Sequence, residues 1–148
     1  MIISRRLTLA MLIPWIALAC HSGRGGMQEP NENTTMDADT LGRKLGLTLP
    51  PGTEVLGVEA ESGVDDAIRA KLRIPTPEAK GFLEGCGVRR FKPGGANLLG
   101  PDHGFWNPHT AKALRFGEIS LPSSRSLLVV IDESSKDALL VFAMNYST

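Results

Sequence analysis

The stretch "TEVLGVEAESGVDDAIRAKLRI", residues Thr53–Ile74, predicts a β-hairpin and thereby decides the fold class. In its second half apolar residues alternate with basic ones, which is the two-residue period of a half-buried strand. The segment "ESGVDD" supplies the polar and glycine residues that are typical of a turn. One register satisfies both faces of the hairpin, and it pairs Ala60 with Ile68, Val58 with Ala70, Leu56 with Leu72 and Glu59 with Arg69.

The remainder of the folded region adds one helix and three strands. "TPEAKGFLEGCG" predicts a short helix, with Thr76 as its N-cap and Pro77 at the first helical position. A helical turn within "LGRKLGLTLPPG" would end at the two prolines. Strands are predicted over 113–121, 126–132 and 138–145, and the last two are apolar enough to be central strands covered on both faces. We therefore predict an α+β domain over residues 41–148, with a mainly antiparallel sheet of about five strands and one short helix packed on a face.

The first 19 residues carry the features of a secretory signal peptide. Arg5 and Arg6 precede an apolar run, Leu7 to Ala19, that is shorter than the roughly 20 residues of a membrane-spanning helix. The paired arginines partly resemble a twin-arginine export signal, whereas the strongly apolar run favours the general secretory route. Residues 1–19 are therefore predicted to be a targeting segment and no part of the fold.

The segment "ALAC" at the end of this run resembles the lipobox of bacterial lipoproteins. That resemblance implies a lipid on Cys20, which becomes the first mature residue, and anchoring to a membrane of the bacterial envelope. His21 rather than aspartate follows the cysteine, which implies the outer membrane if the host has two membranes. Ala17 and Leu18 depart from the family pattern, and the same residues fit ordinary cleavage after Ala19, which would leave a secreted or periplasmic soluble protein.

Residues 20–40 are predicted to be the lipidated cysteine and a flexible polar linker. The segment "HSGRGGMQEPNENTTMDADT" is almost free of apolar residues, so it buries too little surface to offset the entropy of ordering. Cys86 is the one cysteine that follows Cys20 in the sequence, and export would place both in an oxidising compartment. A disulfide between them, or two free thiols, are the alternatives to lipidation of Cys20.

Charge and motifs exclude several classes of function. The 16 basic and 16 acidic residues balance, so a nucleic-acid partner is not predicted. Neither a hydrolase nor a nucleotide-binding motif is present: Gly-x-Ser-x-Gly, Ser-x-x-Lys, His-Glu-x-x-His and the phosphate-binding Gly-Lys-Ser/Thr are all missing. No cofactor is predicted, and Cys86 is interpreted as a buried, inert thiol.

The irregular segment "GPDHGFWNPH", residues 100–109, is the first candidate site. Asp102, His103 and His109 are residue types that bind metals, although their spacing matches no established zinc or iron pattern. The competing interpretation is a structural loop, in which Phe105 and Trp106 cover the sheet and the polar residues make turn hydrogen bonds.

The segment "GVRRFKPGG" is the second candidate, because Arg89, Arg90 and Lys92 surround Phe91 close to two glycines. Such a group can receive a phosphate or a carboxylate. Basic residues at 69, 71 and 73 would extend it if their strand lies alongside, and the competing interpretation is a basic face that keeps a sheet soluble. Together with Trp106 these residues are predicted to contact a ligand or a partner.

Two classes of function follow from these candidates. The first is a non-enzymatic binding or interaction module that is anchored to the membrane and meets an envelope or secreted protein. The alternative is a small metal-binding protein or enzyme that uses residues 102–109. The short chain and the missing motifs favour the first class.

Overall fold

The structure, a computed structural model, describes residues 36–63 and 66–147. The predicted signal peptide, Cys20 and residues 21–35 lie outside the described residues. Within them the chain forms one antiparallel sheet of six strands in the order β1-β2-β6-β5-β4-β3. The strands are β1 Glu54–Glu61, β2 Ala67–Pro75, β3 Lys92–Pro93, β4 Leu114–Leu121, β5 Arg125–Asp132 and β6 Ala138–Ser147.

The predicted hairpin is formed by β1 and β2, with one difference in register. Ala60 lies opposite Ile68, Val58 opposite Ala70, and Glu59 opposite Arg69, as predicted. The prediction that Leu56 faces Leu72 is wrong, because the register shifts between Val55 and Gly57 and Val55 takes that place. The extra residue forms a β-bulge, which alternation alone does not reveal.

The sheet carries one strand and one helix more than predicted. β3 adds a two-residue strand at an edge. The predicted helical turn is the full helix α1, Ala38–Leu45, which begins inside the segment that was predicted to be linker. Its N-cap Asp37 accepts a hydrogen bond from the Thr40 backbone N–H at 2.9 Å, and the helix ends at Gly46 with φ +79°. The α+β class is confirmed, with six strands and two α-helices in the described part of the chain.

The one helix that was predicted is α2, Thr76–Gly85. Thr76 is its first residue and not its N-cap, a position that Pro75 occupies. The Thr76 hydroxyl instead donates to the Lys136 carbonyl oxygen at 2.8 Å, so it links the helix start to the turn before β6.

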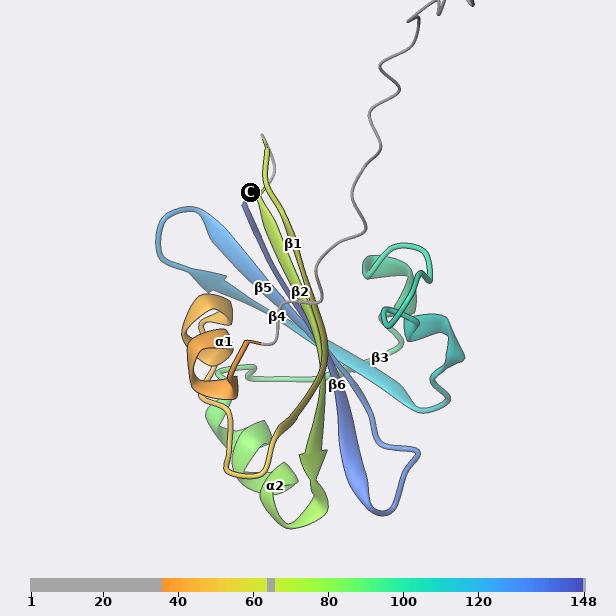
Figure 1. The fold of residues 1–148 in the computed structure, drawn as a ribbon. Coiled ribbons are helices and arrows are strands. Elements are labelled where there is room, and N and C mark those ends of the chain that lie inside the picture. Colours follow the sequence, from red (N-terminus) through yellow and green to blue (C-terminus); the bar gives the residue numbers. More distant parts are fainter. Residues whose placement is uncertain (1–35, 64–65, 148) are drawn as a thin grey trace, which may run out of the picture. The chain divides into compact units, whose positions relative to one another are not determined.

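Each face of the sheet packs against its own hydrophobic core. Both α-helices lie on one face, and the segment with the short 3-10 helices η1 (Ala96–Leu98) and η2 (Pro108–Thr110) lies on the other (Figure 1). Neighbouring residues of β5 and β6 alternate between the two cores, which confirms that these strands are covered on both faces. The helix-side core includes Leu41, Leu45, Leu72, Phe82, Val129, Ile131 and Val141, and the other contains Leu99, Trp106, Leu128, Val130 and Phe142.

Buried Asp132 fixes the entry into β4. Its carboxylate accepts hydrogen bonds from the backbone N–H groups of Ala113 at 3.1 Å and Ser134 at 2.9 Å, with a longer contact to that of Lys112 at 3.4 Å. Burial by itself would raise the pKa of Asp132, but these donors outweigh it and the pKa lies below the ordinary value.

We expect Asp132→Asn to lower the free energy of unfolding by about 2–3 kcal/mol near pH 7, because an amide group then faces backbone donors. A carboxyl with a lowered pKa stabilises the fold above its unfolded pKa of about 4 and loses that effect as pH falls through the folded value. Urea unfolding over a series from neutral to acidic pH should therefore show the difference between wild type and variant shrinking on acidification. A difference that stays constant at every pH would contradict this role.

Candidate functional site

Trp106 belongs to the core and not to a contact surface. Its side chain is 0% exposed, so the prediction that it contacts a ligand or partner is wrong. The indole Nε1 donates to the Leu99 carbonyl oxygen at 2.9 Å, and the ring meets Phe142 edge to face with centroids 5.5 Å apart. Phe105, next to it, lies against β1 at Gly57, where a Cβ atom would come within 2.3 Å of the ring. The predicted cover of the sheet by Phe105 and Trp106 is confirmed.

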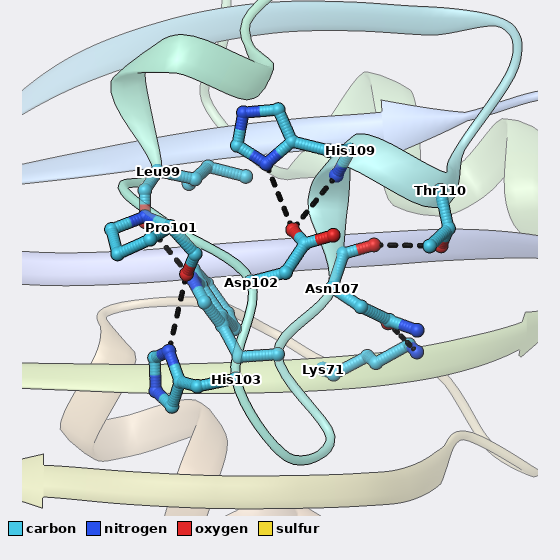
Figure 2. Close-up of polar contacts among 9 residues, drawn as sticks. Lys71, Leu99, Pro101, Asp102, His103, Asn107, His109 and Thr110 are labelled. Atoms are coloured by element: carbon cyan, nitrogen blue, oxygen red, sulfur yellow. Dashed lines mark hydrogen bonds and ion pairs between the residues drawn. The ribbon is translucent and has the colours of Figure 1, made fainter.

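Asp102 and His109 form a pair within the covering loop. One carboxylate oxygen of Asp102 contacts His109 Nδ1 at 2.8 Å and accepts from the His109 backbone N–H at 3.1 Å (Figure 2). The hydrogen bond with the His109 ring, together with that from the backbone, lowers the pKa of Asp102. Both side chains are exposed, so this pair closes a surface turn, as the structural interpretation predicted.

His103 lies apart from this pair, on the side of β1. Its Nε2 contacts a carboxylate oxygen of Glu59 at 2.8 Å, and its Nδ1 contacts the Pro101 carbonyl oxygen at 3.1 Å. Figure 2 shows the His103 ring turned away from Asp102 and His109. Residues 36–63 and 66–147 contain no group of three or more His, Cys, Asp or Glu side chains that could hold a metal ion.

We expect the pKa of His103 to lie above its ordinary value of about 6.5, because the hydrogen bond with Glu59 favours the imidazolium. The resulting stabilisation of the fold is present at pH values below the ordinary pKa of about 6.5 and is lost as pH rises through the folded pKa. NMR titration of the His103 ring should show a raised midpoint that falls back in Glu59→Gln. Glu61→Gln is the matched control, because Glu61 lies on the same strand and pairs with Arg69 instead. An identical midpoint in both variants would refute the pairing.

The predicted basic segment follows α2 and ends in β3, whose first residue is Lys92, and its cations are exposed. Arg89, Arg90 and Lys92 have no ion pair or side-chain hydrogen bond within the described residues. Phe91 is half-buried, and the Arg115 guanidinium lies over its ring at 5.7 Å. Within the part of the chain that the structure describes, the segment therefore presents three cations without a counter-ion around a ring that is held in place.

The basic residues of β2 do not extend this segment. Three strands separate β2 from β3 in the sheet, so the two basic groups lie near opposite edges. Arg69 pairs with Glu61 at 2.6 Å and Arg73 with Glu54 at 2.8 Å. The Lys71 ammonium donates to the Asn107 side chain beside the Phe142 ring, and desolvation lowers its pKa. These cations hold the β1–β2 hairpin and the covering loop.

A groove of about 490 Å³ lies beside the basic segment. Val88, which lines the groove, packs so closely on β4 that a Cβ atom on Gly117 would come within 2.1 Å of it. The residues that line the groove are Gly87, Val88, Arg89, Arg90, Glu118, Ile119 and Ser120. The two arginines were predicted from the sequence, whereas the β4 residues opposite them were not. Gly117 within that strand was a signal that another segment packs closely there.

A second hollow, of about 430 Å³, lies at the turn between β1 and β2 and offers less free charge. Its Arg125 donates through Nε to the Asn145 side chain at 2.7 Å and contacts the Asp66 carbonyl oxygen at 3.5 Å. Two acidic residues, Glu61 and Asp66, and two basic ones, Lys44 and Arg125, line it, whereas two arginines and one glutamate line the groove at the basic segment. The groove at the basic segment is therefore the stronger candidate for a binding site.

Cys86 is buried at the end of α2, as predicted. Burial raises the pKa of its thiol, which donates to the Leu83 carbonyl oxygen at 3.4 Å. A thiol in this state is a weak nucleophile at neutral pH. Cys20, its partner in the alternative disulfide, lies outside the described residues.

Among residues 36–63 and 66–147 no helix is long and apolar enough to cross a bilayer. Comparison of the chain with protein-family models, with curated proteins and with solved structures found no match.

Proposed function

We propose that this protein is a bacterial envelope lipoprotein whose folded domain is a non-enzymatic binding module. The observation that carries the binding role is the basic segment Arg89–Lys92, whose three cations have no counter-ion in the described part of the chain. Packing of Val88 on Gly117 and of Phe91 under Arg115 holds the segment in place. Charges that are held rigidly lose less entropy on binding than charges on a free loop, so this segment suits recognition of an anionic partner.

The membrane part of the proposal rests on the resemblance of "ALAC" to a lipobox. A lipid on Cys20 would tether the domain through the polar residues 21–35 to the surface of a membrane. The mass of the intact mature protein tests this directly. We expect a mass above that of the polypeptide from Cys20 onward by a diacylglycerol and an acyl chain, and loss of the excess in Cys20→Ala. A mass equal to the unmodified polypeptide would contradict lipidation.

Site-specific photo-cross-linking in the native envelope tests the binding role. A photoreactive amino acid at position 90 should form a discrete adduct with one partner. The same amino acid at position 80 is the control, since Lys80 is 86% exposed and lies on α2 outside the groove. No adduct from position 90, or equal adducts from both positions, would contradict a binding surface at the basic segment.

A further inference from the structure

Half of the outer edge of β4 has no neighbouring strand. β4 pairs with β5 along its whole length, whereas β3 pairs only with Arg115 and Phe116. The backbone N–H of Gly94 donates to the Leu114 carbonyl oxygen at 2.9 Å, so the polar backbone groups of Leu114 point outward. Because this direction alternates along a strand, the N–H and C=O groups of Glu118 and Ser120 also point outward. In the described residues no backbone group pairs with them.

The chain reaches this edge only at Lys92, the first residue of β3. Continued backward, the register of β3 would place Arg90 opposite Glu118 and Arg89 opposite Ile119. The segment instead bends over the helix side of the sheet, where Val88 packs on Gly117 and Gly87 approaches the Ile119 side chain. Beside residues 117–121 the position that a longer β3 would occupy is thus open, and the groove of about 490 Å³ lies there.

The opposite edge of the sheet is protected and this one is not. β1 carries a bulge near Leu56, has Phe105 packed on Gly57, and bears Glu54 and Glu61 in ion pairs. Bulges and charges are the usual devices that prevent an edge from pairing with another chain. The open half of β4 has a single charge, Glu118, as the sequence "GEISL" shows.

The Glu118 side chain is exposed, and its carboxylate is held across the sheet. It accepts a hydrogen bond from the Tyr146 hydroxyl at 2.7 Å, and Tyr146 lies on β6, beyond β5. Two arginines, Arg89 and Arg90, and one carboxylate, Glu118, line the groove beside the open edge, so its net charge is positive and favours a partner that carries carboxylates. A second copy of this chain fits less well, because pairing of two β4 edges would bring the arginines of both copies together.

We infer that an extended, acidic segment of a partner protein adds to the sheet as a strand along residues 117–121 of β4, with its carboxylates facing Arg89 and Arg90. This inference rests on the proposed binding function. Backbone hydrogen bonds to Glu118 and Ser120 would supply affinity, as in other proteins that bind peptides at a sheet edge. The two arginines would select the acidic sequence.

The test uses an acetylated peptide of about seven residues, the length of an ordinary strand, in which glutamate alternates with valine. With the folded protein we expect slower amide hydrogen exchange at Glu118 and Ser120, and peptide binding measured by fluorescence anisotropy. The same peptide with glutamine in place of glutamate should bind roughly tenfold more weakly. A peptide with N-methyl groups on alternate residues, which cannot pair as a strand, should not bind.

Two pairs of variants separate the edge from the charges. Ser120→Pro removes an outward N–H that β5 does not use, and proline is tolerated at such an edge position, so the fold should persist while binding is lost. Ser120→Ala is its control and should bind as wild type. Arg89→Ala with Arg90→Ala should weaken binding roughly tenfold, whereas Lys80→Ala with Lys136→Ala removes as much charge elsewhere without effect.

Several results would overturn strand addition. These are binding of the N-methylated peptide, full binding by Ser120→Pro, or unchanged exchange at Glu118 and Ser120 with the peptide in large excess. A dimer in sedimentation equilibrium that Ser120→Pro abolishes would make a second copy the occupant and overturn the acidic partner. If one of these results is obtained and position 90 still forms its adduct in the envelope, strand addition is wrong while the proposed binding function stands. If that adduct is missing, the proposed function itself fails.

Discussion

Trp106→Ala is expected to lower the free energy of unfolding by about 3–5 kcal/mol, the range for removal of a large aromatic side chain from a core. The indole is fully buried, and it fills the space between the covering loop and Phe142 on β6. The substitution also leaves the Leu99 carbonyl oxygen without its donor. Because small domains are stable by about 5–15 kcal/mol, this single change should remove a large part of the stability.

Urea unfolding followed by circular dichroism measures this loss. Fluorescence is unsuitable, since Trp15 is the other tryptophan and lies in the predicted signal peptide. Trp106→Phe is the matched control, because it keeps an aromatic ring and removes the Nε1 donor; we expect a smaller loss of about 1–2 kcal/mol. A loss below about 1 kcal/mol in Trp106→Ala would mean that the loop does not pack on the sheet as described.

The sequence predicted those parts of the fold that depend on local patterns. Alternation in β2 fixed the hairpin register from Val58 to Ala60, because a slip of one residue would have moved Arg69 into the helix-side core. The bulge at Leu56 was missed, since the register shift between Val55 and Gly57 leaves no mark in the alternation of the residues. Helix α1 was underestimated because its N-cap Asp37 stands in a polar stretch that resembles linker.

The candidate site depended on contacts between distant residues, which one sequence does not reveal. His103 contacts Glu59, 44 residues earlier, and Lys71 contacts Asn107, 36 residues later. The sequence grouped His103 with Asp102 and His109 because they are close along the chain. In the fold the His103 ring contacts Glu59 on β1, while His109 contacts Asp102 within the loop. The basic residues were found because they are contiguous, but the open edge of β4 depends on where the short β3 ends.

Asn145 is the second position at which a single substitution should have a large effect. The side chain is 3% exposed and lies at the end of β6 beneath helix α1. Its Nδ2 donates to the Lys44 and Leu45 carbonyl oxygens, both at 3.1 Å, so it satisfies groups that the end of α1 leaves unpaired. Its Oδ1 accepts from Arg125 Nε at 2.7 Å. One amide thus joins α1, β5 and β6.

We expect Asn145→Asp to destabilise the domain by about 3–5 kcal/mol near pH 7, although it changes only one atom of the side chain. A buried carboxylate oxygen would then face two carbonyl oxygens where a donor stood. The folded state should therefore raise the pKa of the new carboxyl above its unfolded value of about 4. A carboxyl whose pKa is raised by folding stabilises the fold at pH values below its unfolded pKa and loses that effect as pH rises. Acidification should therefore narrow the difference in free energy of unfolding between Asn145→Asp and wild type.

Arg125→Ala is the matched control for this prediction. It removes the partner of Oδ1 but leaves both hydrogen bonds to α1, so we expect a loss of about 1 kcal/mol with no recovery on acidification. Urea unfolding of the three proteins at neutral and mildly acidic pH gives both quantities. Equal losses in the two variants would place the stabilisation in the contact with Arg125. The larger, pH-dependent loss in Asn145→Asp would assign the stabilisation to the hydrogen bonds with the carbonyl groups of α1. Helix α1 would then be held in position by a residue 100 positions later in the chain.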